Sequence, residues 1–338
     1  MRLLITGGAG FVGSRLARTL LAKGELNGQK IEHLILADQF PAPADLAADP
    51  RVSVKTGPLL THCKELETEA VDGVFHLASA VSGECEDDFD LGLRSNLDST
   101  RALLDALRKR TEGGAKPTRL VFSSSVAVFG PDGAYPMPSI VADDTLPTPQ
   151  TSYGIQKHIC EHLIADYTRK GYIDGRSARL MTVTVRPGKP NGAASSFFSG
   201  IIREPLAGIP SVCPVAPEVL HPMASPRSTI EGLIKVYECS REAYGGRTAL
   251  NLPGLDVTVQ EMLDALERVA GPKVRALVTF ERDERIAGIV SRWAKGSSSK
   301  RANSLGLFPE KSFDDIIRQY IADCQAGPNA ATALKGMQ

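Results

Sequence analysis

The segment Thr6-Gly7-Gly8-Ala9-Gly10-Phe11-Val12-Gly13 decides the fold of this chain. It lies between an apolar run at residues 2–6 and a stretch with helical apolar spacing at residues 10–23. A tight glycine turn between a strand and a helix lets backbone N–H groups and the positive helix end approach a pyrophosphate. The segment therefore predicts a dinucleotide site whose first contacts are Gly7, Gly10, Phe11, Val12 and Gly13.

An acidic residue at the end of the next expected strand strengthens this prediction. The run at residues 33–37 leads directly into Asp38, 25 residues after Gly13. A carboxylate at this place accepts hydrogen bonds from the ribose hydroxyls of an adenosine and repels a 2′-phosphate. Gln39 stands where a basic residue would be needed for that phosphate, so we expect NAD rather than NADP. A glycine turn that serves packing alone is the alternative, and it does not account for the acid.

Short apolar runs alternate with helix-length segments through the first half of the chain, a pattern typical of strand-helix-strand units. Several runs are apolar on both faces, as strands of a parallel sheet covered by helices must be. We expect strands at residues 2–6, 33–37, 52–55, 73–77, 118–123 and 180–186, and helices at residues 10–23, 96–109 and 152–169. The predicted fold class is α/β, a Rossmann-type doubly wound parallel sheet with a smaller C-terminal substrate-binding domain.

The composition changes after residue 186, where Gly, Pro, Ser and Ala dominate. Such a loop-rich texture indicates a domain boundary. We expect an NAD-binding domain at residues 1–188, a substrate-binding domain at 189–325 and a flexible tail at 326–338, with part of 225–255 returning to the first domain. Thr258 and Glu261 have the spacing of a capping box ahead of a helix, and a last amphipathic helix is expected at 313–322.

The overall composition excludes several classes of partner. Lys plus Arg and Asp plus Glu each number 39 among 338 residues, so no surplus charge is present to neutralise nucleic acid or an anionic membrane. No apolar stretch approaches the roughly 20 residues needed to cross a bilayer, and the first strand leaves no room for a signal peptide. The six scattered cysteines form no CxxC pair, which is typical of reduced thiols. We therefore expect a cytoplasmic protein without a nucleic-acid or membrane partner.

Tyr153 and Lys157 lie four residues apart on the helix expected at 152–169, so both side chains project from one face. A nearby ammonium group favours the phenolate form of a tyrosine and so lowers its pKa toward the range of proton exchange near neutrality. Three serines at residues 123–125 end an expected strand, at the sheet edge where such folds bind ligands. Together these residues predict a catalytic site for proton transfer.

The chain resembles the extended short-chain dehydrogenase/reductase family, which includes the nucleotide-sugar epimerases and dehydratases. The matching features occur in the family's order: TGGAGFVG, Asp38, the strand exit His76-Leu77-Ala78-Ser79-Ala80, Asn96, the triple serine and the Tyr153/Lys157 pair. The resemblance implies Tyr153 as the acid/base, Lys157 as the residue holding the nicotinamide ribose, and Ser125 as the hydrogen-bond donor to the reacting oxygen. It also implies cofactor contacts from Leu77, Ala78 and Asn96.

The resemblance also bears on the substrate. Relatives that act on nucleotide sugars carry a nucleotide-clamping segment, which is not recognisable at residues 212–227. The segments around residues 186–206 and 251–255 instead resemble a branch that oxidises four-carbon sugar acids such as D-erythronate. The implied reaction is oxidation at C2 to the 2-oxo acid, with hydride transfer to NAD. Two alternatives stay open: a nucleotide-sugar epimerase or dehydratase using the same catalytic residues, and a non-catalytic NAD-sensing protein.

Polar residues after expected strand ends are the candidates for contacting a small-molecule sugar acid: Ser82, Ser125, Lys189, Asn191 and Arg227. A substrate carboxylate needs a cation or several donors, and Lys189 and Arg227 fit that role. A solvated loop lysine explains Lys189 equally well.

A competing motif follows the catalytic pair. His158-Ile159-Cys160-Glu161-His162 matches the HxxEH pattern of inverted zinc peptidases, in which two histidines bind one metal. No third ligand is evident downstream, and the dinucleotide signature is complete upstream, so we expect these histidines to bind no metal and the chain to have no metal site. His76 is expected to fill a strand end near the cofactor rather than to act as a base.

The helices expected at 96–109 and 152–169 lie side by side in a doubly wound fold. Relatives with this layout commonly pair such helices into a four-helix bundle, so we expect a homodimer. The apolar area would come from Leu103, Leu104, Leu107, Leu163 and Tyr167, although packing on the sheet explains part of this pattern.

Overall fold

A computed structural model describes residues 1–188 and 193–338, and these residues form two compact units. The first unit consists of Met1–Val128, Pro149–Leu180 and Ile230–Leu250. The second consists of Phe129–Thr148, Met181–Thr229 and Asn251–Gln338. Each unit is therefore built from three separate stretches of the chain.

The first unit contains a sheet of seven strands in the order β13-β9-β7-β6-β1-β4-β5. Its strands are β1 (Arg2–Thr6), β4 (His33–Asp38), β5 (Val52–Thr56), β6 (Gly73–His76), β7 (Thr118–Ser125), β9 (Ile173–Leu180) and β13 (Leu250–Asn251). Neighbouring strands from β9 to β5 run parallel, with Leu4 of β1 opposite Ile35 on one side and Val74 on the other. The expected α/β fold with a doubly wound parallel sheet is confirmed.

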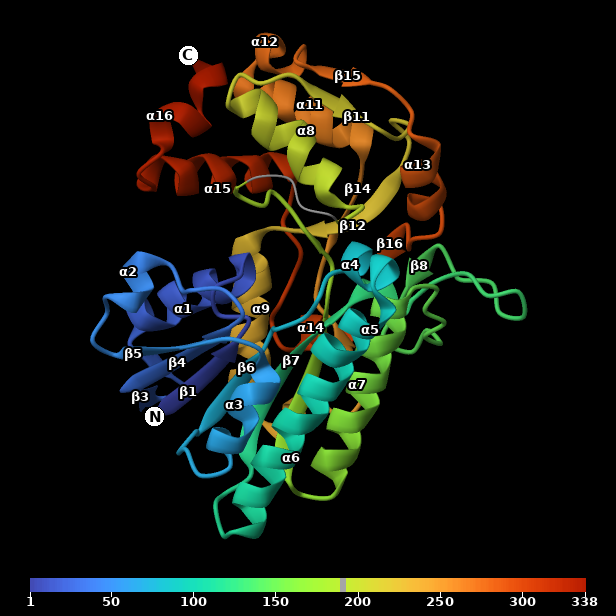
Figure 1. Cartoon of the computed structure of the whole chain (residues 1–338). Coiled ribbons are helices and arrows are strands. Elements are labelled where there is room, and N and C mark those ends of the chain that lie inside the picture. The colour runs from blue at the N-terminus through green and yellow to red at the C-terminus, as the bar shows by residue number, and fades with distance from the viewer. Residues whose placement is uncertain (189–192) are drawn as a thin grey trace. The chain divides into compact units, whose positions relative to one another are not determined.

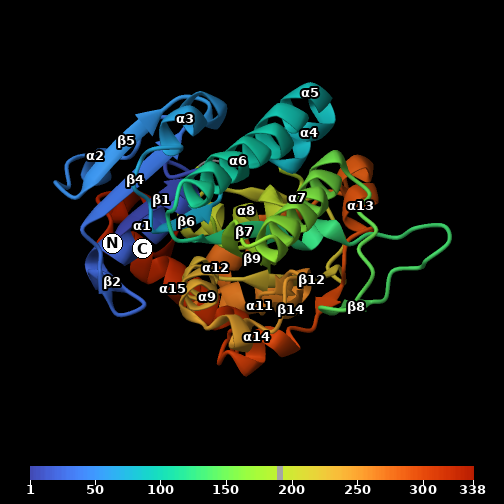
Figure 2. The ribbon, with the colours of Figure 1, turned by 90° about the horizontal axis from the view of Figure 1, so that it is seen from below.

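Helices cover both faces of this sheet (Figures 1 and 2). On one face lie α3 (Leu59–Leu66), α6 (Ser99–Glu112) and α7 (Ser152–Arg169), and on the other α1 (Phe11–Lys23) and α9 (Pro226–Glu238). Leu104 and Ile164 of the first group are buried with Leu4 and Leu120 of the strands, so that face is a continuous apolar core. The alternation of apolar runs and amphipathic helices in the sequence is explained by this two-faced burial.

Tyr237 of α9 covers the central strand β6. Its ring stacks on Phe75, with the ring centroids 5.1 Å apart. A Cβ atom at Gly73 would lie 2.1 Å from the Tyr237 hydroxyl oxygen, so only glycine leaves room for this contact. The backbone oxygen of Tyr237 accepts hydrogen bonds from Arg119 and Arg176. The segment 230–250 is therefore an integral part of the first unit.

The sixth expected strand is placed differently from the prediction. The sheet continues with β9 at Ile173–Leu180, and not with residues 180–186. The sequence of β9 contains Asp174, Arg176 and Arg179, which do not suggest a buried strand. These charges are tolerated because Arg176 lies 3.1 Å from Asp174 and Arg179 pairs with a buried glutamate of α7. Residues 182–183 instead form β10 (Thr182–Val183), in the second unit.

The first unit also contains shorter elements. A π-helical turn at Leu93–Asp98 precedes α6, so the regular helix begins at Ser99 and not at the expected residue 96. The others are a hairpin of β2 (Glu25–Leu26) and β3 (Gln29–Lys30), the helices α2 (Ala44–Ala47), α4 (Ser82–Asp87), α5 (Phe89–Gly92) and α10 (Arg241–Tyr244), and a 3₁₀ turn at Val126–Val128.

The second unit has its own apolar core. Helices α8 (Ser196–Leu206), α11 (Val259–Ala270) and α15 (Phe313–Ala326) supply most of it, including Phe198, Leu263 and Ile317. The expected capping box is present, since Thr258 Oγ1 accepts from Glu261 N and the Glu261 carboxylate accepts from Thr258 N. A small three-stranded sheet has the order β10-β12-β14, in which β12 (Leu220–Ala224) pairs with both β10 and β14 (Leu255–Thr258). Two further pairs join β11 (Ser211–Cys213) with β15 (Val278–Phe280) and β8 (Ile140–Val141) with β16 (Gly296–Ser297).

The C-terminal residues, expected as a flexible tail, carry structure. The remaining helices of this unit are α12 (Pro272–Arg275), α13 (Glu284–Val290), α14 (Lys300–Ser304) and α16 (Ala330–Ala333), followed by a 3₁₀ turn at Lys335–Met337. Leu334 packs against the apolar core, and a Cβ atom at Gly336 would lie 2.2 Å from the Pro205 carbonyl oxygen. In the described part of the chain, none of the helices has the length and apolar character needed to cross a membrane.

Candidate active site

The glycine turn brings three strand ends together. Gly7 has a φ of 71°, a left-handed conformation that favours glycine, and its N–H donates to the Ala37 carbonyl oxygen at 2.8 Å. A Cβ atom at Gly7 would lie 2.8 Å from Ala78 N, and one at Gly13 would lie 2.1 Å from the Gly7 oxygen. Helix α1 can therefore begin directly against the turn, where its N-terminus is available to an anion.

Asp38 holds this turn through its carboxylate. Its Oδ2 accepts from Ala9 N at 2.9 Å and from Gly10 N at 3.3 Å, and its Oδ1 accepts from Phe40 N at 3.1 Å. The acidic residue expected to contact a ribose thus lies at the glycine turn itself. Three features suit the pyrophosphate and ribose of a dinucleotide: the Asp38 carboxylate, the N-terminus of α1, and the close packing at Gly7 and Gly13 that leaves no room for a Cβ atom.

Asn96 organises the exit of β6. Its Oδ1 accepts from Ala80 N at 2.7 Å and from the Ser79 hydroxyl at 3.0 Å. Its Nδ2 donates to Gln156 Oε1 at 2.8 Å, which links the π-helical turn to α7. Leu77 N and Ala78 N both donate to Thr6 Oγ1 at 3.2 Å, so the cofactor-side strand ends form one hydrogen-bonded edge.

The end of β7 meets the start of α7. Ser125 Oγ accepts from Ala127 N at 3.1 Å, and Thr151 caps α7 by accepting from Gly154 N at 3.1 Å. A Cβ atom at Gly154 would lie only 2.2 Å from the Ala127 carbonyl oxygen. Glycine at this position therefore permits the close approach that places the residue before it, Tyr153, beside the strand end that carries Ser125.

Lys157 is buried between the strand and the helix. Its Nζ donates to the Ser123 carbonyl oxygen at 2.8 Å and lies 4.7 Å from the centre of the Phe122 ring. It also lies 5.5 Å from the centre of the Tyr153 ring. Burial lowers the pKa of Lys157 to about 8, outweighing its attraction to nearby acidic groups. When protonated, this ammonium favours the ionised form of a neighbouring phenol.

The HxxEH motif does not form a peptidase site. Glu161 accepts from Arg179 Nε at 2.9 Å and Nη2 at 2.8 Å, and from the Ser124 hydroxyl at 2.5 Å. A buried carboxylate engaged in this way cannot activate a water molecule. Among residues 1–188 and 193–338, no group of three or more His, Cys, Asp or Glu side chains is arranged to hold a metal ion.

His76 lies inside the fold, between two threonines. Its Nδ1 is 2.7 Å from Thr6 Oγ1 and its Nε2 is 2.8 Å from Thr100 Oγ1. Complete burial, with a smaller contribution from Lys157, lowers the pKa of His76 to about 3. The imidazole is therefore neutral at physiological pH and connects β6 to β1 and α6.

The remaining predicted substrate contacts are distributed along the chain. Ser82 begins α4 in the first unit, where Glu86 of the same helix accepts from Ser152 N at 2.7 Å at the start of α7. Arg227 is exposed in the first turn of α9 and belongs to the second unit. Lys189 and Asn191 lie outside the described residues.

The sequence did not single out Gln156, although it is buried next to Lys157 and bonded to Asn96. A single glutamine between Ile155 and Lys157 on one helix gives no signal of its own. The contact depends on the π-helical turn, which the spacing of residues 93–98 does not reveal.

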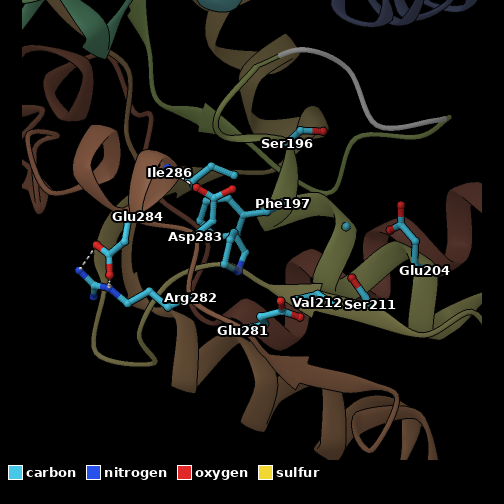
Figure 3. Close-up of a pocket in the computed structure, with 12 residues that line it drawn as sticks. Ser196, Phe197, Glu204, Ser211, Val212, Glu281, Arg282, Asp283, Glu284 and Ile286 are labelled. Atoms are coloured by element: carbon cyan, nitrogen blue, oxygen red, sulfur yellow. Dashed lines mark hydrogen bonds and ion pairs between the residues drawn. The ribbon is translucent and has the colours of Figure 1, made fainter.

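A separate pocket of about 710 Å³ lies within the second unit (Figure 3). It is lined by α8, β11 and residues 281–286, and its charged groups include Glu204, Glu281 and Asp283. Arg282, the basic residue of this lining, donates to Glu284 at 2.7 Å. Among residues 1–188 and 193–338, none of the residues predicted to contact cofactor or substrate lines this pocket. Its acids would repel the anionic substrate that the sequence predicts, so the candidate active site is the one in the first unit.

Residues 3–216 match the model of the NAD dependent epimerase/dehydratase family. The chain belongs to this family. Its cofactor is NAD, in agreement with the glycine turn and Asp38 described above.

Individual relatives cover nearly the whole chain. The D-erythronate dehydrogenase of Cupriavidus necator is 50% identical over 96% of this chain and 98% of its own length. The D-erythronate dehydrogenase of Haemophilus influenzae is 42% identical over 95% and 99% of the two chains. A crystal structure of the nucleoside-diphosphate-sugar epimerase from Agrobacterium tumefaciens has a TM-score of 0.91 and 44% identity, covering 97% of this chain and 95% of that one. This epimerase/dehydratase family member thus has relatives named for two different reactions.

Proposed function

We propose that this protein is an NAD-dependent dehydrogenase that oxidises a four-carbon sugar acid, D-erythronate or a close analogue, at C2. The observation that carries this proposal is the 50% identity to a D-erythronate dehydrogenase over nearly the full length of both chains. The arrangement of Ser125, Tyr153 and Lys157 around one strand end suits the removal of a hydroxyl proton. The product is the 2-oxo acid.

In the proposed reaction, the protein removes the proton and fixes the reacting oxygen. The Tyr153 phenolate takes the proton of the C2 hydroxyl as the carbonyl double bond forms. Ser125 Oγ accepts from Ala127 N, so its own hydrogen is directed to another acceptor, which we assign to the reacting oxygen. Bound NAD supplies the acceptor for the hydride that leaves C2. Lys157, held by the Ser123 carbonyl, keeps a positive charge beside the phenol.

Further residues complete the proposal. The first unit would bind NAD through the glycine turn, Asp38, Leu77, Ala78 and Asn96, and the second unit would supply substrate contacts. We assign the substrate carboxylate to Lys189 and Arg227, with Ser82 and Asn191 contacting hydroxyl groups. Substitution of either cation by Met should raise KM for the sugar acid and leave NAD binding unchanged. All six cysteines are free thiols, which supports a cytoplasmic location.

We also propose a homodimer formed through α6 and α7. The leucines expected to supply its apolar area do not do so, because Leu103, Leu104 and Leu107 are buried against the sheet. Leu163 and Tyr167 are partly buried against the same core. The exposed apolar residues of α7 are Ile155 and Ile159, which are 46% and 39% exposed. They lie four residues apart on one side of the helix, as a surface that pairs with a second copy requires.

An assay of NADH formation over a panel of aldonic acids and UDP-sugars tests the proposed reaction. We expect NADH formation with D-erythronate and none with UDP-sugars. The name of the Agrobacterium relative favours a nucleotide-sugar epimerase as the second candidate, and conversion of a UDP-sugar without net NADH formation would replace our proposal by that one.

Tyr153→Phe tests the catalytic assignment. The change removes the ionisable oxygen only, so turnover should fall by about 10²–10⁴-fold while NAD binding is retained. Tyr135→Phe, at an exposed tyrosine of the second unit, is the matched control and should keep full activity. Near-normal turnover of the Tyr153 variant would exclude Tyr153 as the acid/base.

A further inference from the structure

The two histidines of the HxxEH motif, which the proposed reaction does not use, face each other on α7. His158 Nε2 and His162 Nε2 are 3.3 Å apart, and the two rings meet edge to face with centroids separated by 4.6 Å. Without a metal ion, one of these nitrogens donates its hydrogen to the lone pair of the other; with that hydrogen on Nδ1 of the same ring, the lone pairs of both Nε2 atoms face the space between the rings. The two nitrogens therefore converge on one point beside the helix.

A carboxylate sets which nitrogen of His158 is available. Glu161 Oε2 lies 3.2 Å from His158 Nδ1, and a carboxylate only accepts, so the hydrogen of the neutral ring is on Nδ1. The lone pair is then on Nε2, the atom that faces His162. A histidine that donates its other N–H to a carboxylate is the usual arrangement around a bound metal ion.

Glu161 is itself held in place. Its Oε1 accepts from the Ser124 hydroxyl at 2.5 Å and from Arg179 Nε at 2.9 Å. Its carboxylate is 5% exposed and is fixed by Arg179 through two hydrogen bonds. The orientation of His158 therefore rests on a rigid buried ion pair and not on a mobile surface group.

The spacing of the two nitrogens matches that of a metal site. A tetrahedral zinc ion with Zn–N distances of about 2.0–2.1 Å places two nitrogen ligands about 3.3 Å apart. We propose that His158 and His162 form a binding site for a divalent transition-metal ion such as Zn²⁺, with water in the remaining positions. Imidazole ligands favour Zn²⁺, Cu²⁺ and Ni²⁺ over Mg²⁺ and Ca²⁺.

In the single chain the proposed site is open to solvent, on the same side of α7 as Ile155 and Ile159, which we propose to pair with a second copy. The His158 side chain is 25% exposed, and His162 is an exposed residue of the same helix. Neither ring is assigned a role in NAD binding or hydride transfer, so metal binding and dehydrogenase activity can be measured independently. Structural zinc ions have four protein ligands, so two protein ligands, even with Glu161 orienting His158, imply reversible binding and not a permanent structural ion.

Competition with a chromogenic zinc chelator tests this site in the full-length chain, prepared without a histidine tag and stripped with EDTA. We expect uptake of one Zn²⁺ per chain and a rise in the unfolding temperature with added Zn²⁺, because an ion that binds only the folded state stabilises it. Added Mg²⁺ should cause neither effect. Uptake of one ion per two chains would mean that two copies of the chain supply the ligands, and it would overturn the proposal that water fills the remaining coordination positions.

Matched variants decide which residues bind the ion. His162→Gln changes an exposed residue and should abolish both the uptake and the thermal shift, and His158→Gln should do the same. His62→Gln, on α3, removes one histidine elsewhere and should behave as the wild type. The unfolding temperatures without metal show whether each variant is folded. Equal zinc uptake by the wild type and a folded His162 variant, or no uptake by the wild type, would overturn the proposal.

Discussion

Lys157 Nζ donates a 2.8 Å hydrogen bond to the carbonyl oxygen of Ser123, which fastens the helix that carries Tyr153 to the strand that ends in Ser125. Lys157 is only 3% exposed, and its ammonium group lies over the Phe122 ring. Burying a cation lowers the free energy of unfolding, and buried charged groups of this kind are concentrated at functional sites.

Stability should depend on pH through Lys157. Burial lowers the pKa of Lys157 from 10.5 to about 8, so the folded chain binds this proton less tightly than the unfolded chain. The free energy of unfolding therefore rises with pH between about 8 and 10.5, by at most about 3 kcal/mol from this group. Below about pH 8 the cost of the buried charge is fully present. Lys157→Met should lack this rise, as measured by urea unfolding at pH 7, 8, 9 and 10.

The control for that experiment is Lys116→Met, at an exposed lysine, which should follow the pH dependence of the wild type. The same pH dependence in the Lys157 variant would contradict the assignment. The Lys157 variant should also bind NAD more weakly, if the amine reaches the nicotinamide ribose as proposed.

Gly154→Ala should separate Tyr153 from the strand end. The new Cβ would lie 2.2 Å from the Ala127 oxygen, a backbone atom that cannot move aside without shifting the chain. We expect a loss of about 1–3 kcal/mol in unfolding free energy and a fall in kcat of about 10²-fold from misplaced reacting groups. Gly133→Ala, where a Cβ meets nothing within 4 Å, is the control and should leave both unchanged. Full activity of the Gly154 variant would show that the close approach of α7 to Ala127 is not required for catalysis.

Asp38 supports the glycine turn through its hydrogen bonds, and we predict that it also selects NAD over NADP. Asp38→Asn keeps an oxygen that can accept from Ala9 N and Gly10 N but removes the charge that repels a 2′-phosphate. Asp38→Ala removes both the accepting oxygen and the charge. Both variants should narrow the preference of kcat/KM for NAD over NADP, and Asp38→Ala should lose more activity with NAD. An unchanged cofactor ratio in both variants would argue against Asp38 as the selective residue.

Ile159→Glu should disrupt the proposed homodimer. The change places a charge on the exposed side of α7 without altering the buried core. Light scattering at micromolar concentration should give a dimer mass for the wild type and a monomer mass for the variant. Phe308→Glu, at a phenylalanine of the second unit that is 65% exposed, should remain dimeric. A monomeric wild type would refute the proposal outright.

Most of the strands in the first unit's sheet were predictable, because a buried strand of a parallel sheet appears in the sequence as a short apolar run. Four of the first five strands end within one residue of the predicted ends, and β7 extends two residues further to Ser125. The sixth strand was misplaced because its buried arginines resemble surface residues in the sequence. Only the pairing of Arg179 with Glu161, from a different element, shows why these charges are tolerated.

The site was predictable to the extent that its residues lie in short local patterns. Tyr153 and Lys157 share a helix, and the structure places Lys157 within 5.5 Å of the Tyr153 ring centre. The link between Gln156 and Asn96 was not predictable, because it joins residues 60 apart through an irregular helical turn. Spacing along one helix is visible in a sequence, whereas contacts between elements require their packing.

The position of Tyr237 on β6 has a consequence for biosynthesis. The ribosome completes the strands from β1 to β9 before it adds the segment 230–250 that covers Phe75 and fills the space at Gly73. Until then the nascent chain presents an uncovered apolar face, the kind of surface that chaperones bind. A translation product that stops before residue 237 leaves this face permanently open, so we expect truncated chains to aggregate and to be degraded.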